Sequence, residues 1–110
     1  MITYNLTLED MPSRDKKLSN IAIVENFKSS KSGLPIANQF IITLQNGIEV
    51  FQSYNSIIAV KANNETYLDQ NRWNYSRTTS RYRNQFLNET TVETVKKIGF
   101  GNYTMVDLNK

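Results

Sequence analysis

Apolar and polar residues alternate along much of the first part of the chain, which is typical of strands that bury one face. Residues 2–8 read Ile-Thr-Tyr-Asn-Leu-Thr-Leu, and residues 21–27 form a second run rich in β-branched side chains. Residues 28–35 are polar and include a glycine and a proline, which indicates a loop. The pattern therefore predicts strands at residues 2–8 and 21–27.

Asn46-Gly47 lies between two β-prone runs and is a strong hairpin signal, because both central positions of a tight hairpin turn need a positive φ. A two-residue turn there pairs Thr43 with Val50 and leaves apolar residues on both faces of the hairpin. We therefore expect helices to cover one of the two faces.

Asn63-Asn64 marks a second tight turn between two runs of strand-forming residues. A two-residue turn at this place pairs Val60 with Tyr67. Together the two hairpins predict a four-stranded antiparallel meander over residues 39–69.

The period of the apolar positions then changes from two to 3.6, which predicts helices. In the first helix, about residues 76–88, the expected buried face consists of Tyr75, Thr79, Tyr82 and Phe86. In the second helix, about residues 91–98, it consists of Val92, Val95 and Ile98. Thr90 and Glu93 fit a capping box at its start, and Glu93 is spaced to pair with Lys97.

With a final strand at residues 102–108, these elements predict an α+β fold. A mostly antiparallel sheet of five to seven strands carries two consecutive helices on one face. The length of 110 residues indicates a single domain, residues 1–110. There is no membrane-length apolar run and no signal-peptide pattern, so we expect a cytoplasmic protein that does not enter a membrane.

The composition excludes several classes of chemistry, because the chain contains neither histidine nor cysteine. This absence excludes cysteine nucleophiles, disulfide frameworks, zinc fingers and histidine-based catalytic triads. The aspartates and glutamates show no metal-binding spacing, and the four glycines form no phosphate-binding loop. We therefore expect a non-enzymatic protein without catalytic residues, cofactor or metal site.

Positive charge is concentrated in residues 70–88, which hold four of the five arginines and no acidic residue. Arginine presents a fixed fork of donors that suits phosphate and carboxylate groups. This segment also contains the single tryptophan and two tyrosines, so the arginines lie among side chains that can stack on bases.

Two motifs in this region carry a resemblance to a known domain. Residues 53–59 read Ser-Tyr-Asn-Ser-Ile-Ile-Ala, and residues 75–87 read Tyr-Ser-Arg-Thr-Thr-Ser-Arg-Tyr-Arg-Asn-Gln-Phe-Leu. They resemble a domain of small uncharacterised phage and mobile-element proteins, in which a histidine is frequent where this chain has Tyr82. The resemblance implies a phage protein in the host bacterial cytoplasm, but it implies no mechanism.

The start of the first helix is the candidate binding site, because free backbone N–H groups there favour anions. The predicted ligand is nucleic acid, a nucleotide or another phosphate-bearing molecule. The candidate binding residues are Arg72, Trp73, Tyr75, Ser76, Arg77, Thr78, Thr79, Ser80, Arg81 and Arg83.

Other interpretations of the same residues stay open. The aromatic side chains can pack on the sheet while the arginines are solvated or paired with Glu49, Glu65 or Asp69. Among functions, the alternatives are a counter-defence or host-takeover inhibitor that binds a bacterial protein or a signalling nucleotide, and a structural component of the virion. Open strand edges in so small a sheet also make a homodimer an alternative to a monomer.

Overall fold

The computed structural model describes residues 22–110, so the strand expected at residues 2–8 lies outside the described part. In chain order the described elements are β1 (Ala22–Lys28), β2 (Pro35–Leu44), β3 (Glu49–Ser53), β4 (Ser56–Ala62), β5 (Glu65–Asp69), α2 (Arg77–Leu87), α3 (Thr91–Gly99) and β6 (Thr104–Val106).

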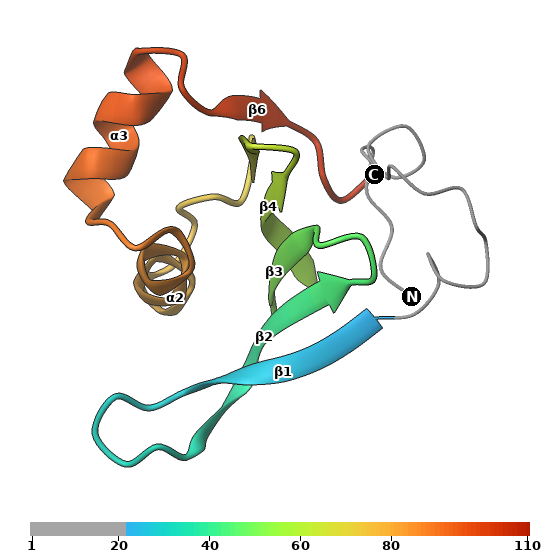
Figure 1. Cartoon of the computed structure of the whole chain (residues 1–110). Coiled ribbons are helices and arrows are strands. Elements are labelled where there is room, and N and C mark those ends of the chain that lie inside the picture. The colour runs from blue at the N-terminus through green and yellow to red at the C-terminus, as the bar shows by residue number, and fades with distance from the viewer. Residues whose placement is uncertain (1–21) are drawn as a thin grey trace.

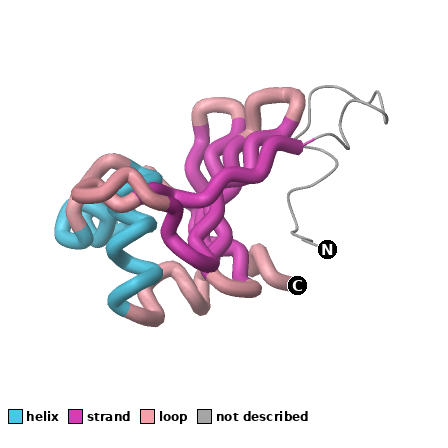
Figure 2. Tube along the Cα trace, turned by 90° about the horizontal axis from the view of Figure 1, so that it is seen from below, coloured by secondary structure: helices cyan, strands magenta, loops and turns pink. Residues whose placement is uncertain are grey.

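The described strands form one six-stranded sheet in the order β1-β2-β3-β4-β5-β6. β1 to β5 pair antiparallel with their sequence neighbours, while β6 pairs parallel with β5 because α2 and α3 carry the chain back across the sheet. Both helices lie on the same side of the strands (Figures 1 and 2). The predicted α+β fold is confirmed.

The first hairpin has a different register from the predicted one. Val50 pairs with Ile42 rather than with Thr43. The chain turns through three residues instead of two: the Leu44 N–H donates to the carbonyl of Ile48, and Gly47 takes a φ of +89°. A three-residue loop with glycine in the left-handed region is the next commonest hairpin turn after the two-residue one.

The second hairpin has the predicted register, with Val60 opposite Tyr67. Asn63 and Asn64 both have positive φ, at +54° and +68°, as a two-residue turn that matches strand twist requires.

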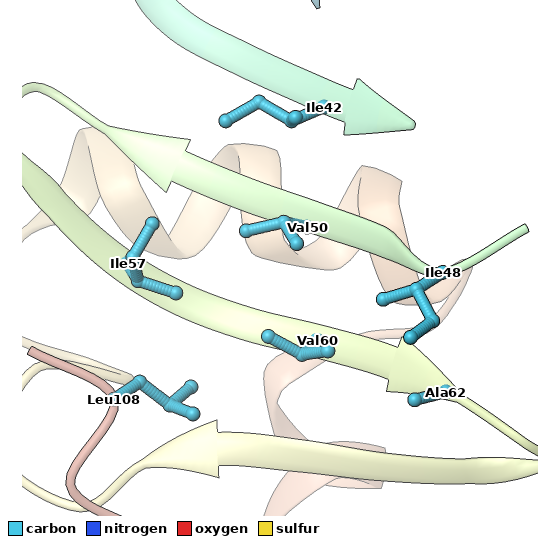
Figure 3. Packing of buried hydrophobic residues seen from close by; sticks show 7 residues of the cluster. All are labelled: Ile42, Ile48, Val50, Ile57, Val60, Ala62 and Leu108. Carbon is cyan, nitrogen blue, oxygen red and sulfur yellow. The ribbon is translucent and has the colours of Figure 1, made fainter. Parts of the chain in front are cut away.

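Each face of the sheet has its own apolar cluster. On the face away from α2, the cluster consists of Ile42, Ile48, Val50, Ile57, Val60, Ala62 and Leu108 (Figure 3). On the helix side, the cluster consists of Phe27, Phe51, Ile58, Ala59, Leu68, Tyr82 and Phe86. Tyr82 and Phe86 come from α2, so burial of these two rings seats that helix on the strands.

The second helix departs from its predicted packing. Its capping box forms as expected between Thr90 and Glu93. Val92 and Val95, expected to be buried, are 64% and 53% exposed, and the residue that is buried is Thr94. Ile98, the third residue of the predicted stripe, is partly buried and packs against the helix-side cluster. The prediction therefore holds for Ile98 and fails for the two valines, because polar contacts also hold this helix.

The polar contacts converge on the carboxylate of Glu89, whose side chain is 3% exposed. It accepts hydrogen bonds from Thr94 Oγ1 at 2.6 Å, Lys97 Nζ at 2.7 Å and Tyr103 Oη at 2.8 Å. Lys97 thus pairs with Glu89, not with Glu93 as predicted. Burial by itself raises the pKa of Glu89, but these hydrogen bonds and the Lys97 charge outweigh it, so its pKa lies below the ordinary value.

Candidate functional site

The two sequence motifs are brought together at the start of α2. Ser53, at the end of β3, has its Oγ 2.9 Å from Oγ1 of Thr79 in the first turn of α2. Ser76, which caps the helix, accepts from the Thr79 N–H at 3.1 Å and donates to the Thr79 hydroxyl at 3.0 Å. This chain of three hydroxyls fixes α2 against the turn between β3 and β4.

Arg77 and Arg81 are both exposed and lie one turn apart on α2. Neither forms an ion pair with any carboxylate of residues 22–110, where the two ion pairs are Lys61–Glu49 and Lys97–Glu89. The first turn of α2 also contains no acidic residue. Two guanidinium groups therefore project from one helix face without a counter-charge in the described structure.

These two arginines line a hollow on each of their flanks. The first, of about 660 Å³, is here called the polar hollow, and its lining is Asn74, Tyr75, Ser76, Arg77, Ser80, Arg81 and Asn84. The second, of about 460 Å³, is here called the tyrosine hollow, and its lining is Ile36, Ala37, Tyr54, Arg77, Thr78, Arg81 and Tyr82. Both hollows are open to solvent, the polar hollow more widely than the tyrosine hollow.

Arg83 does not belong to this surface, which corrects the expectation that it contacts a ligand. Its side chain is fully buried, because residues two positions apart on a helix point about 200° apart and Arg81 faces solvent. Nη1 donates to the carbonyl of Trp73 at 2.7 Å and to Oδ1 of Asn74 at 3.0 Å. Nη2 donates to Oδ1 of Asn84 and Oγ1 of Thr91, both at 2.9 Å.

The role of Arg83 is therefore to position other groups. It ties Asn74 and Asn84, which line the polar hollow, to the start of α3. Burial lowers the pKa of Arg83 and the charge of Glu89 opposes that shift, yet a guanidinium keeps its proton in proteins.

Thr79 and Trp73 are also occupied by contacts within the protein. Thr79 is fully buried in the hydroxyl chain, so it is not open to a ligand from solvent. Trp73 is half-buried and has its ring centroid 5.1 Å from the guanidinium carbon of Arg83, which makes a cation–π contact. The ring that was expected from the sequence to stack on a base therefore lies against a buried cation.

The remaining predicted residues lie at or near the surface. Tyr75, 47% exposed, Ser76 and Ser80 line the polar hollow, and Thr78 lines the tyrosine hollow. Arg72 is exposed but lines neither. The structure thus gathers Tyr75, Ser76, Arg77, Thr78, Ser80 and Arg81 around the two hollows and separates Arg72, Trp73, Thr79 and Arg83 from them.

The carboxylates considered as partners of the arginines have other contacts or none. Glu49 lies 4.0 Å from Lys61. Asp69 is buried and accepts from the backbone N–H groups of Asn71, Arg72 and Leu108. Glu65 forms no ion pair with the described residues.

Asn74 and Tyr54 were not in the predicted site. The sequence did contain a signal for Tyr54, because it belongs to the first of the two motifs. Only the contact between the motifs shows that they form one surface.

Comparison with known proteins finds one family. A model described as "Family of unknown function (DUF8033)" matches residues 22–102, which include every described element of the sheet's meander and both helices. No curated protein and no solved structure matches the chain. Of the helices in residues 22–110, none has the length and apolar character needed to cross a bilayer, and no group of three or more acidic side chains there is placed to hold a metal ion.

Proposed function

The chain belongs to the DUF8033 family, whose function is unknown, and we propose that it is a small non-enzymatic protein that binds nucleic acid or another phosphate-bearing ligand. The observation that carries the proposal is the pair Arg77 and Arg81. Both guanidinium groups are exposed, one turn apart, and unpaired by any carboxylate of residues 22–110.

A phosphate suits this pair for a physical reason. Guanidinium groups bind phosphate oxygens through two parallel N–H···O bonds, and a second guanidinium one turn away can hold the other side of the same group. Ser76, Ser80 and Asn74 line the adjacent polar hollow, where the Ser76 and Ser80 hydroxyls already donate to Thr79 and Asn74. The two guanidinium groups are therefore the main donors to an anion there. No acidic side chain lines that hollow to repel an anion.

A phage origin and a place in the host bacterial cytoplasm belong to the same proposal. They are supported by the resemblance of residues 53–59 and 75–87 to small phage and mobile-element proteins. A non-enzymatic role is supported by the lack of histidine and cysteine in the whole chain.

The test is fluorescence anisotropy with labelled single-stranded DNA and RNA at several salt concentrations. We expect binding that weakens as salt increases, since each neutralised phosphate releases counterions. In the double variant Arg77→Ala/Arg81→Ala, the slope of log K against log salt on single strands should be less negative by about 1.4, because two phosphate contacts are lost.

The matched control is Lys28→Ala/Lys31→Ala, which removes the same charge from exposed positions at the β1–β2 turn. It should keep most of the wild-type affinity. Equal losses from both double variants would show a non-specific charge effect, and no binding at low salt would reject the proposal.

A second candidate function is inhibition of a bacterial protein by direct binding. It is favoured by the exposed apolar side chains of Val92 and Val95, which are three positions apart on α3 and so lie on the same side of the helix. Contiguous exposed apolar groups are typical of protein interfaces. A pull-down with wild-type protein and Val92→Ser/Val95→Ser tests this candidate, which requires a stoichiometric bacterial partner that survives nuclease treatment and is lost in the variant.

A further inference from the structure

The tyrosine hollow differs in chemistry from the polar hollow on the other flank of the arginines. Its lining combines the aromatic rings of Tyr54 and Tyr82 with the aliphatic side chains of Ile36 and Ala37. Amide side chains are missing from this lining, and its polar groups are the two arginines, Thr78 and the tyrosine hydroxyls. The same cations therefore border one hollow lined by hydroxyl and amide side chains and one in which aromatic and aliphatic side chains lie among polar ones.

Tyr54 is the exposed aromatic residue of this hollow. It is 48% exposed, whereas Tyr82 is 7% exposed and belongs to the helix-side core. The Tyr54 N–H donates to the carbonyl of Asn38 at 2.7 Å, and its own carbonyl accepts from Gln52 Nε2 at 2.6 Å. These bonds fix the turn to β2 and β3, and the contact between the Ser53 and Thr79 hydroxyls joins the end of β3 to α2.

The backbone of Tyr54 is unusual for a large side chain. It occupies the first central position of the two-residue turn between Ser53 and Ser56, with a φ of +55°. Glycine and asparagine adopt this region readily, but for a bulky residue it is an outlier that costs free energy. A half-exposed ring contributes little packing energy to offset this backbone strain. Such residues are frequent at binding sites, so we look for a binding role for Tyr54.

An aromatic ring beside two guanidinium groups suits a nucleotide, which consists of a flat base and a negatively charged phosphate joined by a sugar. Every base has a π-face that stacks on tyrosine irrespective of sequence, and the phosphate joined to it carries the negative charge. In a duplex the bases are stacked and paired, so a base can enter a hollow in the protein surface only when it is unpaired.

We propose that the tyrosine hollow binds the base of a nucleoside phosphate, with Tyr54 as its stacking surface and Arg77 and Arg81 on its phosphate. This rests on the proposed function and deepens it, because it names an unpaired base as an obligatory part of the ligand. The two sources of such a ligand are single-stranded nucleic acid and a free nucleotide.

The experiment compares four probes of defined composition by anisotropy or competition. They are a single-stranded 12-mer, an abasic 12-mer of the same length, the corresponding duplex, and a mononucleotide as competitor. The proteins are wild type, Tyr54→Gly, Tyr54→Phe and the control Phe100→Ala, which removes an exposed ring that lines neither hollow. Glycine adopts the φ of residue 54 without strain, so Tyr54→Gly should fold, as a thermal melt will verify.

We expect wild type to bind the 12-mer more tightly than the abasic strand or the duplex. Tyr54→Gly should weaken 12-mer binding by about 5- to 100-fold, and leave abasic binding unchanged. Tyr54→Phe and Phe100→Ala should bind the 12-mer as tightly as wild type does. Competition by the mononucleotide at a concentration close to that of the 12-mer identifies a free nucleotide as the source, and its failure identifies single strands.

The proposal is overturned if wild type binds the abasic strand as tightly as the 12-mer, or if Tyr54→Gly and Phe100→Ala have equal effects. In either case loss of binding in Arg77→Ala/Arg81→Ala would leave the phosphate-binding function standing. If no probe binds, the proposed function fails, and the base site fails with it.

Discussion

Nη1 of Arg83 lies 3.0 Å from Oδ1 of Asn74, so a fully buried cation on α2 holds one wall of the polar hollow. The same Asn74 oxygen accepts from the Ser80 hydroxyl at 2.5 Å. The wall is therefore bonded to two positions of α2, and the segment before the helix is fixed to its outer face. The arginine that does not reach solvent is thus needed for the shape of the surface that the exposed arginines line.

This arrangement predicts different outcomes for two identical substitutions. Arg83→Lys should lower the free energy of unfolding by about 2 kcal/mol or more, because lysine has three donors on a point charge and cannot reach four acceptors on different segments. Arg81→Lys, at an exposed position, should change it by less than about 0.5 kcal/mol. Urea denaturation of both variants measures this, and equal effects would contradict the assigned role of Arg83.

Gln39 carries a second stability prediction. Its side chain is fully buried opposite Ser53, and neither its oxygen nor its nitrogen has a hydrogen-bond partner among the described residues. Burying an unpaired amide is unfavourable, so Gln39→Met should raise the free energy of unfolding by about 1 kcal/mol. The exposed Gln85→Met on α2 is the control and should stay within about 0.5 kcal/mol of wild type. A destabilised Gln39→Met would show that the amide is paired in solution.

Glu89 predicts a pH dependence of stability. Since its pKa is lower in the folded protein than in the unfolded chain, the unfolded chain binds more protons at acidic pH. The stabilisation by Glu89 is therefore fully present above about pH 4.5 and is lost as the pH falls through the folded pKa. The stability difference between wild type and Glu89→Gln should be constant from pH 7 to pH 5 and shrink below that. Denaturant unfolding at each pH measures it, and a difference that stays constant below pH 5 would contradict the stabilising role of the Glu89 carboxylate.

Two glycines predict opposite responses to the same substitution. Gly47 has a φ of +89° in the first hairpin turn, so alanine there is strained and should cost about 1 kcal/mol. Gly99 is the last residue of α3 and has no positive φ, and a methyl group on its Cα would meet no other atom within 4 Å. Gly99→Ala should therefore stabilise the protein by about 0.5 kcal/mol. Thermal melts of both variants check the signs, and a stabilising Gly47→Ala would argue against the three-residue turn.

The elements of the fold could be predicted because their signals are local. The Asn63-Asn64 turn specifies its own register through two positive φ values, and the capping box of α3 involves only Thr90 and Glu93. The register of the first hairpin could not be predicted, because Asn46-Gly47 suits both a two-residue and a three-residue loop. The three-residue loop that the structure shows pairs Ile42 with Val50, and both side chains pack in the same apolar cluster.

The candidate site shows the same division. The helical period was sufficient to place Arg77 and Arg81 on one face, and the composition of residues 70–88 to mark the segment as anion-attracting. The sequence of residues 70–88 did not show which of its arginines remain exposed without a partner in the folded protein. The hydrogen bonds of the buried Arg83 are completed from outside that segment, by the hydroxyl of Thr91 at the start of α3.

By itself the sequence determined the type and order of the described elements, the capping box of α3 and the concentration of arginine before and within α2. These depend on φ preferences, side-chain period and hydrogen bonds between residues a few positions apart. Only the tertiary structure decided that Tyr54 stands beside Arg77, that Arg83 is internal and that α3 leaves Val92 and Val95 in solvent. Those outcomes depend on contacts between segments far apart in the chain. Which contacts form is determined by the burial and hydrogen bonding that they allow, and the spacing of residues along the sequence does not show this.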